Sequence, residues 1–197
     1  MGIPLPCLRS LREWASCIDM RQGLIDDVFT VLKIAGKNMT AKERVVVLGY
    51  DEMSVNSTVE YDKRHDSIIG PYKEMQVVSA RGLFGKWKQP VYAAFNQMMT
   101  KSILDNIITR FHEIGYTVVA NVHDCGGSNL KLWKQIGITY EEEKTAMQHP
   151  ITKKDVYFFP DAPHLLKLFR NWLLDHGFLY KGWINFILCL NFMFFQT

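Results

Sequence analysis

A run of aliphatic residues that ends in two acids constrains the fold of this chain most strongly. Residues 45–55 read VVVLGYDEMSV, so that a buried strand leads directly into Asp51 and Glu52. Carboxylates at the end of a core strand lose hydration, which is costly unless a hydrogen-bonded turn or a cation compensates for it. The segment therefore predicts a buried strand that ends in a polar turn or in a metal site.

The same pattern recurs in YTVVANVHD, where a second buried strand ends at Asp124 before the sequence CGGSN. Sites in open α/β sheets form beyond the carboxyl ends of strands. If the two strands are parallel neighbours, both carboxylates project into one crevice, where a divalent cation such as Mg²⁺ would relieve their repulsion. An aspartate before two glycines is also a common turn residue, and this interpretation stays open.

The residues beside the two aspartates carry weaker signals. Glu52 should point to the opposite side if the strand continues, which leaves it a weak second ligand. His123 is expected to be a hydrogen-bonded histidine and not a ligand. The glycines at positions 126 and 127 would let the backbone approach a phosphate closely.

The order of apolar patterns predicts strands with short connections first and helical crossovers later. Such an order is typical of a mixed sheet, as in a ribonuclease H-like α/β fold, although other α/β domains come close to it. The expected strands or hairpins lie in residues 45–50, 59–72, 74–84, 89–95, 116–124 and 155–159, and the expected helices in residues 100–114, 128–137 and 160–177.

Three regions are expected along the chain. Residues 1–40 contain two helical patterns, which indicate a helix-turn-helix-like segment or a packing appendage. Residues 43–178 form the main domain. Residues 179–197 contain the apolar sequence WINFILCLNFMFFQT, which is short for a membrane helix. Two interpretations are expected for this tail. Either the chain stops inside a larger fold, or its last residues come from an aberrant reading frame.

The segment PDAPHLLKLFRNWLLDHG predicts a capped amphipathic helix. Asp161 occupies the expected N-cap position, and Gly177 is the expected stop. His164 follows one turn after the cap, where a capping and packing role is expected. Arg170 and Asn171 near the end of the helix could contact DNA phosphate or belong to a solvated face.

The amino-acid composition indicates the type of cellular compartment, but it does not identify binding partners. The net charge of +3, from 23 basic and 20 acidic residues, is too small to indicate nucleic-acid binding by itself. The four cysteines form no C-x-x-C pair and no disulfide pattern, which favours a reducing compartment. The first residues show no signal peptide.

Three of these segments together resemble P element transposases and their THAP-domain relatives. They are LGYDEMSV, the strand into NVHDCGGSN, and FFPDAPHLLKLFRN, and the resemblance extends over roughly residues 4–178. It implies a ribonuclease H-like domain of the D-D-E kind, which acts on DNA in the nucleus with Mg²⁺. Asp51 matches the first catalytic and metal-binding aspartate of the family, and Asp124 matches the second.

The resemblance is partial. The family carries a GTP-binding insertion, followed by a third catalytic acid, a glutamate, and neither occurs among these residues. The zinc-binding THAP pattern of cysteines and histidine is also missing. The resemblance thus implies a transposase fragment that binds DNA transposon ends, with possible self-association and no membrane anchor, and that does not cut DNA alone.

Two other functions stay open. One is a transposon-derived, non-catalytic module that binds DNA or protein through the N-terminal helices, which carry Arg9, Arg12 and Arg21. The other is an exonuclease-like metal nuclease on the same sheet, which would need further carboxylates on a late helix.

Overall fold

A computed structural model describes residues 6–15, 21–63, 65–139 and 143–177. The chain divides into two compact units, Met1–Phe159 and Pro160–Thr197. The first unit contains a sheet with helices, and the second contains one helix within its described part.

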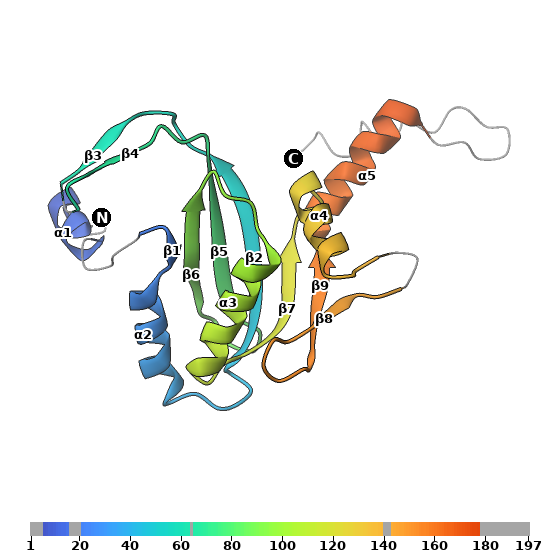
Figure 1. Cartoon of the computed structure of the whole chain (residues 1–197), viewed down its shortest axis with the longest axis horizontal. Helices are drawn as coiled ribbons and strands as arrows, with labels where there is room; N and C mark the ends of the chain where they lie inside the picture. The colour runs from blue at the N-terminus through green and yellow to red at the C-terminus, as the bar shows by residue number, and fades with distance from the viewer. Residues whose placement is uncertain (1–5, 16–20, 64, 140–142, 178–197) are drawn as a thin grey trace, which may run out of the picture. The chain divides into compact units, whose positions relative to one another are not determined.

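A mixed seven-stranded sheet forms the first unit (Figure 1). Its spatial order is β1-β6-β5-β2-β7-β9-β8, so that the two strands predicted to end in aspartates are neighbours at the centre. The strands are β1 (Gly23–Leu24), β2 (Val45–Ser54), β5 (Glu74–Gly82), β6 (Lys88–Phe95), β7 (Thr117–His123), β8 (Ala146–Gln148) and β9 (Asp155–Pro160).

The pairing directions follow from the lengths of the connections. Antiparallel pairs join β5 to β6 through the short loop of residues 83–87, and β2 to β5 across residues 55–73, which contain a small hairpin. The helix α3 (Lys101–Glu113) follows β6 and returns the chain to β7, which pairs with β2 in parallel. The predicted mixed sheet, with antiparallel strands first and a helical crossover to a parallel strand later, is therefore confirmed.

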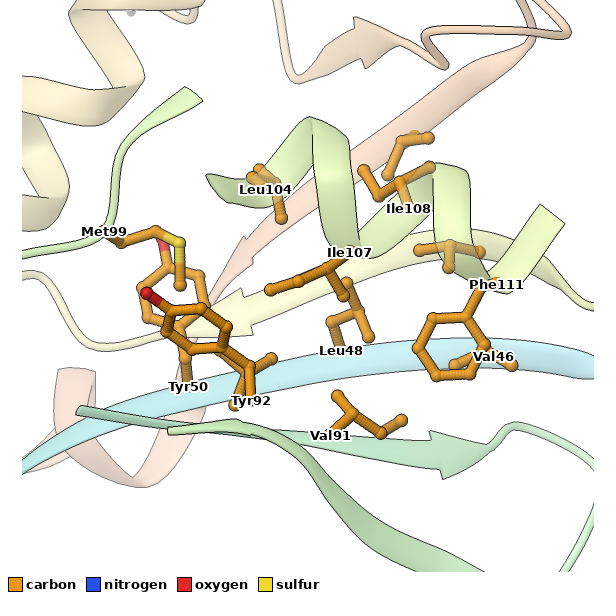
Figure 2. Close-up of a cluster of buried hydrophobic side chains, with 14 of the residues drawn as sticks. Val46, Leu48, Tyr50, Val91, Tyr92, Met99, Leu104, Ile107, Ile108 and Phe111 are labelled. Atoms are coloured by element: carbon orange, nitrogen blue, oxygen red, sulfur yellow. The ribbon is translucent and has the colours of Figure 1, made fainter. Parts of the chain in front are cut away.

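The core lies between this sheet and the apolar face of α3. Thr100 caps the helix, since its side-chain oxygen accepts a hydrogen bond from the backbone N–H of Ile103. The apolar side chains of α3 point toward β2 and β6 (Figure 2). The fully buried residues of this contact are Val46, Leu48, Val91, Leu104, Ile107, Ile108 and Phe111.

The helix α2 (Asp26–Gly36) packs into the same core. Phe29 is fully buried, and its ring meets that of Phe111 edge-on at 5.1 Å between centroids. Asp26 accepts a 3.0 Å ion-paired hydrogen bond from Arg110 of α3. The expected segment 1–40 thus contains two helices, α1 (Leu8–Ala15) and α2, of which the second is built into the sheet domain together with β1. Its resemblance to a DNA-binding helix-turn-helix stays a prediction.

Two very short strands and one small hairpin complete the unit. β1 and β8 have only two and three residues, too few for an apolar period to indicate them. The expected hairpin in residues 59–72 forms a separate two-stranded sheet of β3 (Glu60–Asp62) and β4 (Ser67–Ile69). The helix α4 (Gly127–Gln135) follows β7 directly.

The second unit contains the helix α5 (Ala162–His176), close to its expected bounds. Asp161 stands at the N-cap, although its side chain makes no capping hydrogen bond, and Gly177 ends the helix with φ of 73°. Neither α5 nor any other helix within the described ranges is long and apolar enough to cross a membrane. The tail of residues 179–197 lies outside the described residues.

Candidate metal and phosphate site

A pocket of about 300 Å³ lies where β2 and β7 end. Its walls come from the end of β2, the start of β5, and the loop and first turn of α4 that follow β7. Four acids line it, namely Asp51, Glu52, Glu74 and Asp124. Because the walls carry so many carboxylates and no basic side chain, the pocket suits a cation.

The register of the two central strands explains why both aspartates reach this pocket. Tyr50 of β2 is paired with His123 of β7, and their rings stack at 4.7 Å between centroids. Asp51 is the next residue of β2, and Asp124 is the first residue after the end of β7. Both therefore lie at the same end of the two paired strands, where they line the pocket.

Each aspartate has one carboxylate oxygen in a local hydrogen bond. Oδ1 of Asp51 accepts a 2.8 Å bond from the backbone N–H of Glu52. Oδ1 of Asp124 accepts a 3.0 Å bond from the N–H of Gly126 and a 2.6 Å bond from Nδ2 of Asn129. Among the described residues, the Oδ2 atom of neither aspartate accepts a hydrogen bond. The turn and the cation interpretations of Asp124 are therefore compatible, because the turn occupies only one oxygen.

Both ring nitrogens of His123 take part in hydrogen bonds, as expected. Its Nε2 accepts a 2.7 Å bond from the indole N–H of Trp133, so that its Nδ1 carries the proton and donates to the backbone oxygen of Asp124 at 2.6 Å. Burial lowers the pKa of His123, and the neighbouring Asp124 opposes this shift only partly. His123 is thus a neutral residue that anchors the strand end, with no nitrogen left for a metal.

Glu52 was predicted to point to the opposite side from Asp51 if the strand continues, which β2 does, and to be a weak second ligand. It lines the same pocket as Asp51, and its Oε1 accepts a 3.3 Å bond from the hydroxyl of Ser128. The pocket wraps around the end of β2, so that side chains from both faces of the strand reach it. The pKa of the Tyr50 phenol is raised, first by burial and then by the nearby negative charges of Asp124 and Glu52. This shift indicates that acidic groups are concentrated at this end of the strands.

The metal-binding capacity of the pocket is limited. Within the part of the chain that the structure describes, no three His, Cys, Asp or Glu side chains are grouped closely enough to hold a metal ion. Asp51 and Asp124 fit two positions of an oxygen-ligand site for Mg²⁺, which commonly uses one or two carboxylates and completes its shell with water and phosphate.

The other four residues singled out from the sequence lie in the second unit. Asp161 and His164 occupy the cap and first turn of α5, and the exposed Arg170 and Asn171 follow two turns later, where the guanidinium of Arg170 donates to Asn171 Oδ1 at 3.2 Å. Their proposed DNA contacts stay predictions.

Sequence reasoning missed Asn129, which contacts Asp124 directly. The available signal was its place five residues after the aspartate, in the first turn of the predicted helix. A buried side chain at this position faces back toward the strand end, because helical side chains lean toward the N-terminus.

The two glycines after Asp124 should respond differently to alanine. A Cβ atom at Gly126 would come within 3.1 Å of Oδ1 of Asp124, whereas one at Gly127 would meet nothing within 4 Å. We expect Gly127→Ala to raise the free energy of unfolding by about 0.4–1 kcal/mol, because alanine restricts the unfolded chain. Gly126→Ala should show no such gain, since the carboxylate must shift. Urea unfolding of both variants measures the difference, and an equal gain at both positions would contradict the geometry.

Comparison with known proteins places this site in a family. Residues 20–137 match the family described as TNP-like, RNase H N-terminal domain. The chain is 38% identical over 182 residues to the transposable element P transposase of Drosophila melanogaster, covering 92% of this chain and 24% of that protein. It also matches a chain of the Drosophila P element transposase strand transfer complex with a TM-score of 0.77 and 37% identity, over 90% of this chain and 40% of that one.

These matches cover both central strands, the pocket between them and the helix α4. The chain spans about a quarter of the length of the curated relative that it matches. The chain therefore belongs to the TNP-like RNase H N-terminal domain family and has the ribonuclease H-like fold of the P element transposases.

Proposed function

We propose that this chain forms the first part of a DNA transposase active site and supplies two of its metal-binding carboxylates. The observation that carries the proposal is the convergence of Asp51 and Asp124 from adjacent parallel strands on one pocket. These residues match the first two acids of the D-D-E set in the P element resemblance. The proposed cation is Mg²⁺, and the proposed partner is transposon-end DNA in the nucleus.

Different residues of the chain would bind the cation and the phosphate at this site. Asp51 and Asp124 would each offer the Oδ2 atom that no turn hydrogen bond occupies. Bound Mg²⁺ would supply activation of the attacking oxygen and stabilisation of the leaving oxygen in phosphodiester chemistry. The open space beside Gly127 would admit a phosphate close to the backbone.

Two carboxylates alone are expected to be insufficient for catalysis. The family's third acid would complete the charge that holds the cations, and its guanine-nucleotide site lies in the insertion. We therefore propose that the 197 residues bind a divalent cation weakly and do not cut DNA by themselves.

The test is a titration of the full chain with Mn²⁺, in which electron paramagnetic resonance measures the free ion. Asp51→Asn and Asp124→Asn should each weaken Mn²⁺ binding by at least about tenfold, because each removes one anionic ligand of a small set. Asp155→Asn is the matched control, because it removes the same charge at an exposed position of β9 that does not line the pocket.

An equal loss of affinity in all three variants would mean that only net charge attracts the ion, and the proposed site would be wrong. Incubation with transposon-end DNA and Mg²⁺ or Mn²⁺ tests the second half of the proposal. Nicking that requires the metal and disappears in Asp51→Ala would show that the chain is catalytic alone.

A non-catalytic DNA-binding module is the second candidate. It is favoured by the finding that, in the described ranges, no third metal-binding side chain joins the two aspartates. Salt-dependent DNA binding that survives the double variant Asp51→Asn/Asp124→Asn would support this candidate, because phosphate contacts would then lie elsewhere.

A further inference from the structure

The amide of Asn129 makes the shortest hydrogen bond to the carboxylate of Asp124. Its Nδ2 atom lies 2.6 Å from Asp124 Oδ1 and 3.4 Å from the backbone oxygen of the same residue. Asn129 lines the pocket, but the residue is only 4% exposed. We infer that Asn129 is a positioning residue, which holds Asp124 so that Oδ2 is the oxygen presented to a cation. The inference deepens the proposed function and rests on it.

Two donors on one oxygen fix the rotation of the carboxylate. The N–H of Gly126 alone would form an ordinary aspartate turn, in which the carboxylate can exchange its two oxygens by rotation. The second donor from Asn129 reaches the same Oδ1 from the helix, so that exchange would break two hydrogen bonds at once. A carboxylate held in this way acts as a one-oxygen ligand with a defined direction, as second donors do at known metal sites.

Stability alone does not explain an asparagine at this position. Its Oδ1 atom is buried and has no hydrogen-bond partner among the described residues. A buried polar atom without a partner costs about 1–3 kcal/mol, and an apolar residue of similar volume would avoid that cost. An asparagine at this position is therefore better explained by the hydrogen bond that its Nδ2 donates to the carboxylate of Asp124.

The helix that carries Asn129 is itself tied to the strand end. Trp133, one turn later in α4, donates its indole N–H to His123, and His123 donates to the backbone oxygen of Asp124. The backbone and the side chain of Asp124 are thus both held by α4. A site on such rigid elements keeps its ligand geometry better than a site on a free loop.

Mn²⁺ titration of the full chain tests the inference with Asn129→Leu and Asn129→Ala. Both variants should bind Mn²⁺ about 10–100-fold more weakly than the wild type, the range known for lost second donors. Asn121→Ala is the matched control, because Asn121 is also a buried asparagine near the end of β7 but does not line the pocket. Wild-type affinity in both Asn129 variants, together with lost affinity in Asp124→Asn, would overturn the inference and leave the proposed function intact.

A metal-free readout separates the two proposals. In the wild type, one Nδ2 proton of Asn129 should be shifted downfield and exchange slowly with water in ¹H–¹⁵N NMR spectra, because it lies in a short bond to a carboxylate. Asp124→Ala should abolish this signature. If the signature is present but the wild-type protein binds no Mn²⁺, the hydrogen bond between Asn129 and Asp124 is real, but the proposed function fails and with it the role of that bond toward a cation. If Asp124→Ala leaves the Asn129 signals unchanged, the positioning role is wrong.

Discussion

Replacement of Phe29 by alanine is expected to lower the free energy of unfolding of the whole sheet domain by about 3–5 kcal/mol, the usual cost of removing a core phenylalanine. Phe29 is fully buried and meets Phe111 of α3 edge-on at 5.1 Å. The substitution removes this aromatic contact and leaves a cavity between two helices. Urea unfolding, followed by tryptophan fluorescence and by far-ultraviolet circular dichroism, measures the change.

Val31→Ala is the control for Phe29→Ala. Val31 lies two residues later in α2 and is 59% exposed, so its loss should change the free energy of unfolding by no more than about 0.5 kcal/mol. If Phe29→Ala has an equally small effect, α2 is an appendage and not part of the domain core. Coincident transitions by both probes with a large loss of stability would mean that the sheet domain begins before residue 40.

The long periodic elements were predictable from the sequence because each has a clear apolar pattern. Strands β2 and β7 read as aliphatic runs, and α3 has a capping threonine, an apolar face and a terminal glycine. The meeting of Asp51 and Asp124 followed from one assumption, that these strands are parallel neighbours. The structure confirms that adjacency, whereas the catalytic and metal-binding roles of the two residues stay predictions.

What the sequence did not reveal depends on contacts between distant segments. β1 has two residues, and only its pairing with β6 makes it a strand. Strand alternation puts Glu52 on the opposite side from Asp51, but it could not reveal that the pocket wraps around the strand end and includes both residues. Asn129 was missed because its role depends on how the first turn of α4 faces Asp124, a matter of packing and not of pattern.

Acid should destabilise the sheet domain at a pH where most carboxylates are still charged, because two of its histidines are held neutral. In His123, protonation of Nε2 would displace the indole N–H of Trp133. In His149, Nδ1 accepts bonds from the backbone N–H groups of Ile151 and Thr152, and protonation there would break both. Burial is the largest cause that lowers the pKa of each histidine.

The surroundings of His149 add smaller effects of both signs. The nearby His112 of α3, whose ring centroid lies 5.5 Å away, and Lys153 lower the pKa of His149 further, whereas Asp105 opposes them. For His123, Asp124 is the opposing charge. The net direction is downward in both cases, so that each histidine stays neutral in the folded state below its ordinary pKa of 6.5.

The direction of the pH effect follows from which state takes up protons first. As the pH falls through 6.5, the unfolded chain protonates these histidines while the folded chain does not. Proton uptake thus favours unfolding, and stability declines by up to about 1.4 kcal/mol per pH unit for each histidine until its lower folded pKa is reached. Above pH 6.5 both contributions are complete, and stability should no longer change through them.

Asn and Ala substitutions at position 149 separate titration from hydrogen bonding. Asparagine can still accept the two backbone N–H bonds but cannot be protonated, so His149→Asn should keep near-wild-type stability at pH 7 and show a shallower decline between pH 7 and 5.5. His149→Ala should show the same shallow decline from a stability about 1–3 kcal/mol lower, because both N–H groups lose their partner. Urea unfolding at several pH values measures these slopes. A wild-type slope in both variants would mean that His149 titrates alike in the folded and unfolded states, against the geometry that surrounds it.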